Sequence, residues 1–272
     1  MVDSNRSHRI SGTLGNLQLS MRANYDQYGV DNYYRKVGAT YRNPHFPGVR
    51  ACLYTWLDRW WAHERGTVRT RPPLIFDMAC GNGEVTVAAY EWWKGAGSKR
   101  KSRAPPLGGN IGANSSGTSN PSSFQHPPDV HIMAADPYTV EAYLERTTLP
   151  CAPLTFMEIA QGALPLVISS FNSLRDVSDS QASAPKMDMV ICSFALHLVE
   201  SPSELFALLW ELSANAHWLV VLAPHKKPEI KDGWGWAKWD CETWSQCQMS
   251  DRKGDYVLER VHCRMYRSVN VL

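Results

Sequence analysis

The stretch that decides the fold of this 272-residue chain is Pro73-Leu-Ile-Phe-Asp-Met-Ala-Cys-Gly-Asn-Gly-Glu-Val-Thr86. Residues 74–76 form a short apolar run, as a parallel strand covered on both faces by helices requires. Asp77 ends the run. Small residues then follow at every second position, which allows a tight turn and the close approach of a ligand to the backbone: they are Ala79, Gly81 and Gly83. Apolar residues recur at helical spacing from Val85, so the stretch predicts a strand, a glycine-rich turn and a helix start that together form a nucleotide-type site.

The spacing of the turn separates two classes of cofactor. A dinucleotide site reads G-x-G-x-x-G, whereas here Ala79 takes the first glycine position and the last glycine comes early, which disfavours NAD and FAD. The string Asp77-x-Ala-Cys-Gly-x-Gly83 resembles motif I of the class I S-adenosylmethionine-dependent methyltransferases. The resemblance implies that Asp77 and the turn residues Ala79, Gly81 and Gly83 hold the methionine moiety of the cofactor. A tight turn in an unrelated α/β domain is the alternative.

The composition is that of a globular chain with a sizeable core, since 44% of its residues are hydrophobic. The net charge of +2 supplies no overall basic field that would require nucleic acid as a partner. Seven cysteines without a C-x-x-C pair indicate reduced thiols, and no cluster of metal ligands is recognisable. The chain has neither a membrane-length apolar run nor the apolar core of a secretory signal. We therefore expect no membrane association and a cytoplasmic protein, or a nuclear one if the basic cluster at 99–103 is a targeting signal.

The organisation of the chain predicts one domain. Residues 1–24 are polar and without strong periodicity, which predicts a disordered leader before a domain at 25–272. Residues 25–63 predict helices rich in tyrosine and tryptophan, and in the resembled family such a segment is an N-terminal lid over the cofactor. Residues 94–129 consist mainly of Gly, Ser, Asn and Pro, so they predict a disordered insertion.

The remaining segments alternate between strand and helix. This alternation predicts an α/β fold with a doubly wound, Rossmann-like, mainly parallel sheet and helices on both of its faces. The resemblance implies seven strands with an antiparallel last strand. The predicted strands are 74–76, 130–136, 154–157, 187–192, 217–223, 256–261 and 262–269.

Asp136 ends the second predicted strand. In a Rossmann-like site an acidic residue about 20 positions after the glycine turn binds the ribose hydroxyls. Gly83 and Asp136 are 53 residues apart, and 17 remain when the 36 residues of the insertion are removed. The spacing therefore predicts Asp136, followed by Pro137, as cofactor-binding residues, although a chance Asp-Pro turn at a strand end would look the same.

The resemblance implies further cofactor contacts. Glu158 and Ile159 stand where the family places an acidic residue and a backbone amide beside the adenine. Ser193 and Phe194 begin the turn after the fourth strand, which would line the methyl-transfer site. Tyrosines of the lid are available to contact the sulfonium or the substrate, or else to pack on the core: the candidates are Tyr33, Tyr34 and Tyr41.

Methyl transfer needs positioning and, for some acceptors, a base. The candidate bases are His197 and His225, each just beyond a strand's carboxyl end, because the ordinary pKa of histidine suits proton removal near neutral pH. Either histidine could instead cap a helix or bond a carbonyl. Candidates for substrate binding are His45 in the lid, Lys226 for an acidic group or phosphate, and Trp234 and Trp236 for stacking. The alternatives are a solvated lysine and a loop held to the core by its rings.

We therefore predict an S-adenosylmethionine-dependent methyltransferase that acts on an N or O acceptor, most simply on a small molecule, with S-adenosylhomocysteine as product and no metal. One alternative is an RNA methyltransferase (of tRNA or rRNA) that uses the basic insertion. Another is a non-catalytic sensor or interaction protein that binds the cofactor. The sequence does not determine the acceptor atom or the oligomeric state.

Overall fold

The computed structural model describes residues 21–38, 40, 42–64, 66, 72–101, 130–165 and 186–271. Three features discussed above lie wholly or largely outside the described residues. These are the predicted leader up to residue 20, Tyr41 and residues 102–129 of the predicted insertion.

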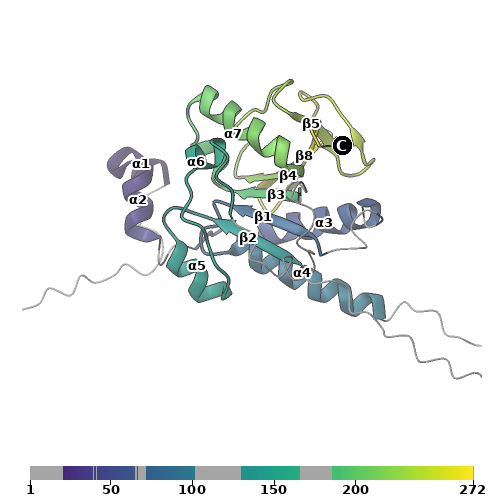
Figure 1. Ribbon diagram of the computed structural model, residues 1–272, viewed down its shortest axis with the longest axis horizontal. Helices are drawn as coiled ribbons and strands as arrows, with labels where there is room; N and C mark the ends of the chain where they lie inside the picture. Colours follow the sequence, from purple (N-terminus) through teal and green to yellow (C-terminus); the bar gives the residue numbers. More distant parts are fainter. Residues whose placement is uncertain are drawn as a thin grey trace, which may run out of the picture.

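The sheet confirms the predicted Rossmann-like, mainly parallel α/β class (Figure 1). Its strands run in the order β2 (His131–Ala135), β1 (Leu74–Met78), β3 (Met187–Ser193), β4 (Ala216–Ala223), β8 (Val261–Ser268), β5 (Trp236–Asp240) and β6 (Ser245–Gln246). Strands β1 to β4 are parallel, and β8 is antiparallel to both β4 and β5. The antiparallel strand near the end of the chain is therefore present, and it lies between two strands that run the other way.

The strand count differs from the prediction, because the sheet has eight strands. The predicted strand at 154–157 is wrong: β2 meets that region only in an isolated bridge between Ala135 and Ala152. Thr155 instead caps helix α6 (Phe156–Ala160). Two short strands are added, namely β5 and β6, whereas the strand predicted at 256–261 is present as β7 (Asp255–Leu258), which pairs with β8 in a hairpin.

Helices cover both faces of the sheet (Figure 1). On one face, α3 (Phe46–Glu64) and α4 (Glu84–Lys101) pack against Ile75, Met189 and Val220. On the other face, α6 and α7 (Pro202–Asn215) pack against Phe76, Val190 and Leu219. Because successive residues of each buried strand belong to opposite faces, the continuous apolar runs seen in the sequence serve two cores. The remaining helices are α1 (Met21–Tyr28), α2 (Val30–Val37), α5 (Val140–Thr147) and the short η2 (Leu196–Leu198).

Two predicted boundaries change. Helix α4 continues to Lys101, eight residues into the segment predicted as an insertion. The predicted lid at 25–63 divides, since α3 buries Leu53, Trp56 and Trp60 in the core, whereas α1 and α2 lie at the carboxyl ends of the strands. None of the described helices is both long enough and apolar enough to cross a lipid bilayer.

Two glycines just before β5 differ in how closely the loop around them packs against α7. Gly233 and Gly235 have φ of 80° and 86°, a region that L-residues rarely adopt. A Cβ on Gly235 would lie 2.1 Å from Ser213 Oγ, whereas a Cβ on Gly233 would meet nothing within 4 Å. We expect Gly233→Ala to lower the free energy of unfolding by about 1–2 kcal/mol, from backbone strain alone. Gly235→Ala should cost about 1–3 kcal/mol more, because it adds overpacking. Urea denaturation of both variants measures the difference, and equal losses would contradict the packing described.

Candidate functional site

A cavity of about 450 Å³ lies at the carboxyl ends of β1, β2 and β3. The register explains why it forms, since Met78 pairs with Ala135 on one side and with Cys192 on the other, so that all three strands end level. Of the predicted cofactor residues, those that line the cavity are Ala79, Gly81, Asp136, Pro137, Ile159, Ser193 and Phe194. Tyr34, a candidate lid tyrosine, also lines it, whereas the sequence did not point to other lining residues, among them Asn43, Thr139, Phe156, Met157 and Glu204.

The turn after β1 is held in an unusual backbone conformation. Ala79, Gly81 and Gly83 all have positive φ, of 55°, 53° and 83°. Phe194, in the turn after β3, has a φ of 57°. For residues other than glycine this conformation costs about 1–3 kcal/mol, and such strain concentrates at functional sites. Gly83 does not line the cavity; a Cβ there would lie 2.6 Å from Thr147 Cγ2, so this glycine permits helix α5 to pack against the turn.

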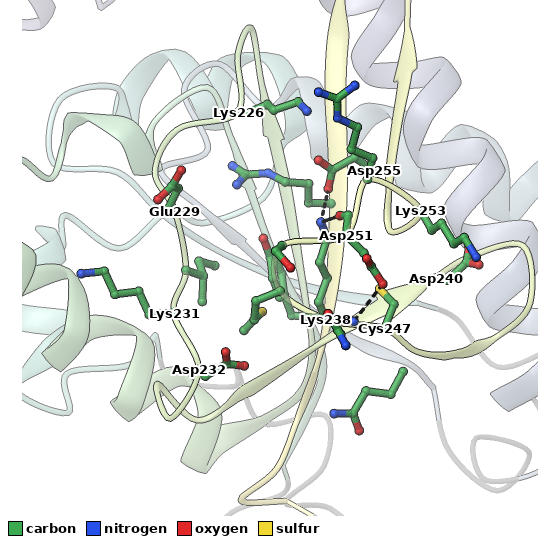
Figure 2. Close-up of a pocket in the computed structure, with 18 of the residues that line it drawn as sticks. Lys226, Glu229, Lys231, Asp232, Lys238, Asp240, Cys247, Asp251, Lys253 and Asp255 are labelled. Atoms are coloured by element: carbon green, nitrogen blue, oxygen red, sulfur yellow. Dashed lines mark hydrogen bonds and ion pairs between the residues drawn. The ribbon is translucent and has the colours of Figure 1, made fainter.

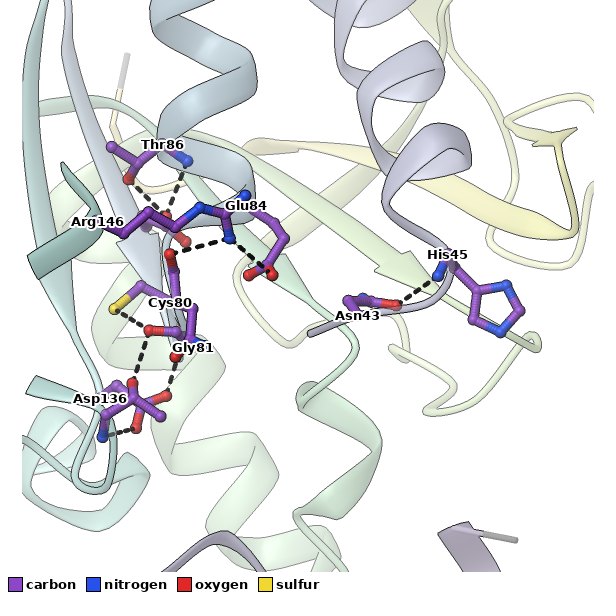
Figure 3. A network of polar contacts seen from close by, with 11 residues as sticks. Asn43, His45, Cys80, Gly81, Glu84, Thr86, Asp136 and Arg146 are labelled. Atoms are coloured by element: carbon purple, nitrogen blue, oxygen red, sulfur yellow. Dashed lines mark hydrogen bonds and ion pairs between the residues drawn. The ribbon is translucent and has the colours of Figure 1, made fainter. Parts of the chain in front are cut away.

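The carboxylate of Asp136 joins the two strand ends. Its Oδ2 accepts the Gly81 N–H at 3.1 Å, and its Oδ1 accepts the N–H groups of Tyr138 at 2.8 Å and Thr139 at 3.1 Å (Figure 3). Thr139 Oγ1 in turn donates to the Gly81 carbonyl at 2.7 Å. Burial raises the pKa of Asp136, and these donors oppose that shift. Asp136 therefore fixes the glycine turn and also presents its carboxylate to the cavity.

Asp77 lies beneath the turn and does not line the cavity. Its Oδ2 accepts the Thr86 N–H at 3.1 Å and the Thr86 hydroxyl at 2.7 Å, which ties β1 to the first turn of α4. Its Oδ1 is buried and has no hydrogen-bond partner among the described residues. Complete burial raises the pKa of Asp77 to about 8, against the hydrogen bonds from Thr86.

The predicted contact through Glu158 is corrected. The Glu158 carboxylate accepts the Thr155 N–H at 2.8 Å and hydroxyl at 2.7 Å, and the Thr155 hydroxyl accepts the Glu158 N–H. This is a capping box, whose T-x-x-E pattern is visible in the sequence and predicts a helix start rather than a strand. The cavity wall in this region is apolar and comes from Leu154, Phe156, Met157 and Ile159.

The N-terminal helices close part of the cavity, and of the two described candidate tyrosines only one lines it. Tyr33 is 0% exposed and does not line the cavity, whereas the neighbouring Tyr34 does and stacks on Tyr138 with ring centroids 6.1 Å apart. Asn43 also lines the cavity and accepts the His45 N–H at 2.9 Å (Figure 3). The His45 ring stacks on Phe194, with centroids 5.2 Å apart. His45, predicted to bind the substrate, thus packs on Phe194 and is not itself a lining residue of the cavity.

The two candidate bases lie next to each other. The rings of His197 and His225 are 4.9 Å apart in an edge-to-face contact, so the structure brings together the turns after β3 and β4. Neither ring lines the cavity, although Ala195 and Leu198, on either side of His197, do. Burial lowers the pKa of His197 to about 4, with a smaller contribution from the charge of His225.

The other predicted substrate residues are not brought to this cavity. Trp236 is 2% exposed in β5, and its indole N–H donates to the Leu209 carbonyl at 2.8 Å, so it is a core residue. Trp234 packs edge-to-face on Phe206 of α7, with centroids 5.9 Å apart. Lys226 lines a different cavity. The fold therefore places the three predicted loop residues in different parts of the molecule: Trp236 in the core, Trp234 against α7 and Lys226 at another cavity. No group of three or more His, Cys, Asp or Glu side chains in the described part of the chain is placed to hold a metal ion.

Asp77 should make stability depend on pH. Because its pKa is raised to about 8 from an ordinary 3.8, the folded state binds more protons between these values, and the free energy of unfolding falls as the pH rises through this window. The slope from one such group is at most about 1.4 kcal/mol per pH unit. We expect Asp77→Asn, which imitates the protonated acid, to remove this decline in chemical denaturation between pH 5 and pH 8. Asp77→Ala should instead lose the Thr86 bonds and be destabilised at every pH. Equal stability changes for Asp77→Asn at both ends of the window would contradict a raised pKa.

Comparison with solved structures gives similarities at low identity. One is to magnesium protoporphyrin IX methyltransferase from Synechocystis PCC 6803 with bound SAM, at 13% identity and a TM-score of 0.41, covering 93% of this chain and 99% of that one. Another is to N-methyltransferase NodS from Bradyrhizobium japonicum WM9 in complex with S-adenosyl-L-homocysteine, at 9% identity and a TM-score of 0.36, covering 91% and 97%. Similarity at this level does not identify a function for this chain.

No family model matches the chain. At the sequence level it is 40% identical over 267 residues to the uncharacterized protein C17A5.05c of Schizosaccharomyces pombe (strain 972 / ATCC 24843). The match covers 98% of this chain and 99% of that protein. With this identity over nearly the whole length of both proteins, the chain belongs to the family of C17A5.05c.

Proposed function

We propose that this chain is an S-adenosylmethionine-dependent methyltransferase that methylates an N or O atom of a small molecule. The observation that carries the proposal is the cavity itself. It joins a positive-φ glycine turn, an acidic residue at the end of the next strand and the turn after β3, all at one edge of a parallel sheet. In open α/β sheets, ligands bind outside the carboxyl ends of the strands.

The residues present fit the cofactor. The volume of about 450 Å³ is within the ~300–1,000 Å³ typical of small-molecule sites. Ser193 lines the cavity, and its Oγ is a buried polar atom without a hydrogen-bond partner among the described residues, as expected where a polar ligand supplies the partner. Asp136 would hold the ribose, the apolar wall around Phe156 and Ile159 the adenine, and the turn around Gly81 the amino-acid end.

The cofactor, when bound, would supply an electrophilic methyl group attached to a sulfonium, and the sulfur would become a neutral thioether once the methyl group is transferred. The protein's own part is to orient the acceptor and to remove its proton where it carries one. Since the pKa of His197 is lowered to about 4, this ring is neutral near pH 7, and its buried Nδ1 has no hydrogen-bond partner among the described residues. His225 is exposed beside it and would pass a proton to solvent.

The charge of the site favours a small molecule over RNA. A second lobe of about 660 Å³ shares Val30, Phe156, Met157, Leu198 and Glu204 with the first cavity. No lysine or arginine is among the described residues that line either lobe, whereas Glu200 and Glu204 line the second. Nucleic-acid affinity depends on cations that contact phosphates. Because the lining of both lobes lacks a described cation, it suits a neutral or basic small-molecule acceptor better than RNA.

A non-catalytic cofactor-binding protein is the alternative. It is favoured by the position of His197 and His225 outside the cavity lining. Turnover distinguishes the two functions: a labelled methyl donor offered to fractionated small molecules, RNA and protein should label the small-molecule fraction. Cofactor binding without label in any fraction would favour the alternative.

The cofactor assignment is tested by calorimetry with S-adenosylhomocysteine. We expect the purified protein to bind it, and Asp136→Asn to weaken binding by roughly 10- to 150-fold, because the substitution removes a charged hydrogen-bond acceptor worth about 1.5–3 kcal/mol. Glu158→Gln is the matched control and should bind as the wild type does, since its carboxylate belongs to the capping box. Binding of NAD instead of S-adenosylhomocysteine would overturn the proposal.

His197 should destabilise the protein in acid. Its pKa of about 4 is below the ordinary 6.5, so the unfolded state binds more protons between these values. The free energy of unfolding is therefore not reduced by this group above pH 6.5, where the ring is neutral in both states, and it decreases as the pH falls from 6.5 toward 4. We expect His197→Asn to reduce that loss in chemical denaturation, whereas His225→Asn should retain most of it, because burial is the larger cause of the shift. An unchanged acid slope in His197→Asn would contradict this assignment.

A further inference from the structure

A second cavity, of about 1130 Å³, lies over the other half of the sheet (Figure 2). It shares no lining residue with the two lobes described above. Its floor is the face of β5 and β8 that carries Lys238, Arg264 and Tyr266, and its walls are the segments at 226–232 and 245–253. On this face α7 reaches β5 near Trp236, whereas loops cover the part beyond it.

Most charges on the floor have a close partner. Lys238 is 4% exposed, and its Nζ pairs with Asp255 Oδ1 at 2.7 Å (Figure 2). Asp240 is also buried, and its carboxylate accepts the Glu242 N–H at 2.9 Å and the Thr243 hydroxyl at 2.8 Å. Lys238 therefore has a counter-ion, and both carboxylate oxygens of Asp240 accept a hydrogen bond, although from neutral donors.

Arg264 is different. Its side chain is on the same floor and the residue is 4% exposed, yet no carboxylate of the described residues lies within ion-pair distance of it. Two of its donors bind neutral acceptors, the carbonyls of Pro228 at 2.8 Å and Lys227 at 3.2 Å. Its Nε–H is buried and has no acceptor among the described residues. A buried guanidinium with only neutral partners is costly unless an anion joins it.

The rim determines which anion fits. Six cationic and five acidic side chains line the cavity, and the exposed cation nearest in sequence to His225 is Lys226. Acidic residues such as Glu229, Asp232 and Asp251 alternate with the cations on the walls, so the cavity is not the continuous basic surface that a polyanion such as nucleic acid requires. A molecule with one anionic group and a polar body meets both conditions.

We propose that this second cavity is a binding site for a small molecule that carries a carboxylate or a phosphate, which Arg264 pairs with from the floor and Lys226 from the rim. Arginine suits this role because its planar fork matches either oxyanion. The site is separate from the cofactor cavity, and it goes beyond the proposed methyl transfer rather than depending on it.

The position of the site links it to the other cavity. Ala223, the last residue of β4, pairs with His262 of β8, so the segment that carries His225 and Lys226 begins beside the strand that carries Arg264. His225 contacts His197, which belongs to the turn beside the cofactor cavity. A ligand that neutralises Arg264 therefore changes the electrostatic potential at the histidine pair.

The test uses the full chain and two probes, inorganic phosphate and succinate, titrated at constant ionic strength with sodium chloride. Either probe should raise the melting temperature in a saturable way, because a ligand bound to the folded state adds RT ln(1 + [L]/Kd). Arg264→Gln should abolish the saturable response. Arg267→Gln is the matched control: it removes the same charge from the same strand, but Arg267 lies on the opposite face over Trp218 and Trp239, so the response should persist. A response to phosphate alone would identify a phosphate site, a response to succinate alone a carboxylate site, and a response to both a site that accepts either group.

Two further variants keep the test decisive if Arg264→Gln unfolds. Arg264→Lys retains the charge but not the fork, and Lys226→Gln alters an exposed side chain; each should weaken probe binding several-fold. Binding of S-adenosylhomocysteine should be unchanged in all of them. A wild-type response in both Arg264→Lys and Lys226→Gln, or no response of the wild type beyond that to sodium chloride, would overturn the second site. Failure of S-adenosylhomocysteine to bind would overturn the proposed function instead.

Discussion

The carboxylate of Asp136 is the constraint on which the first cavity depends. One side chain accepts three backbone N–H groups from two separate segments, the turn after β1 and the start of the α5 connection. The turn itself is strained, because Ala79 holds a positive φ. A buried carboxylate is also unfavourable until such donors surround it, as its raised pKa indicates. The turn and the carboxylate therefore stabilise each other, and the first cavity lies between them and the turn after β3.

Sheet register transmits that arrangement to the rest of the site. Since β1, β2 and β3 end level, Asp136, Ala79 and Ser193 face one space although 114 residues separate the last two. The insertion of antiparallel β8 between β4 and β5 then divides the carboxyl edge. Strands β1 to β3, on one side of β8, end at the first cavity, whereas β8 itself and β5 form the floor of the second. One topological feature thus gives the molecule two cavities of different charge.

The local parts of this arrangement were predictable from sequence. The apolar run at 74–76, the small residues after it and the spacing to Asp136 follow from backbone geometry, which is encoded within a few residues. Side-chain direction was not predictable in the same way. Tyr33 and Tyr34 are neighbours, and only the packing of α2 on the body decides that Tyr34 faces the cavity. Glu158 was misplaced because a capping box was taken for a strand end, and Trp236 because a strand within the loop was not recognised.

The charges of the two cavities explain why a single balanced chain can present two kinds of site. The lining of the first cavity contains no described cation, and its acidic residues without an ion pair among the described residues are Asp136 and Glu204, since Glu84 pairs with Arg146 at 3.0 Å. An acidic lining suits a sulfonium, which carries a positive charge until the methyl group has left. The second cavity holds Arg264, which has no carboxylate within ion-pair distance among the described residues. Because the two cavities share no lining residue, an anion can be bound in one without entering the acidic surroundings of the other, and the net charge of +2 conceals this division.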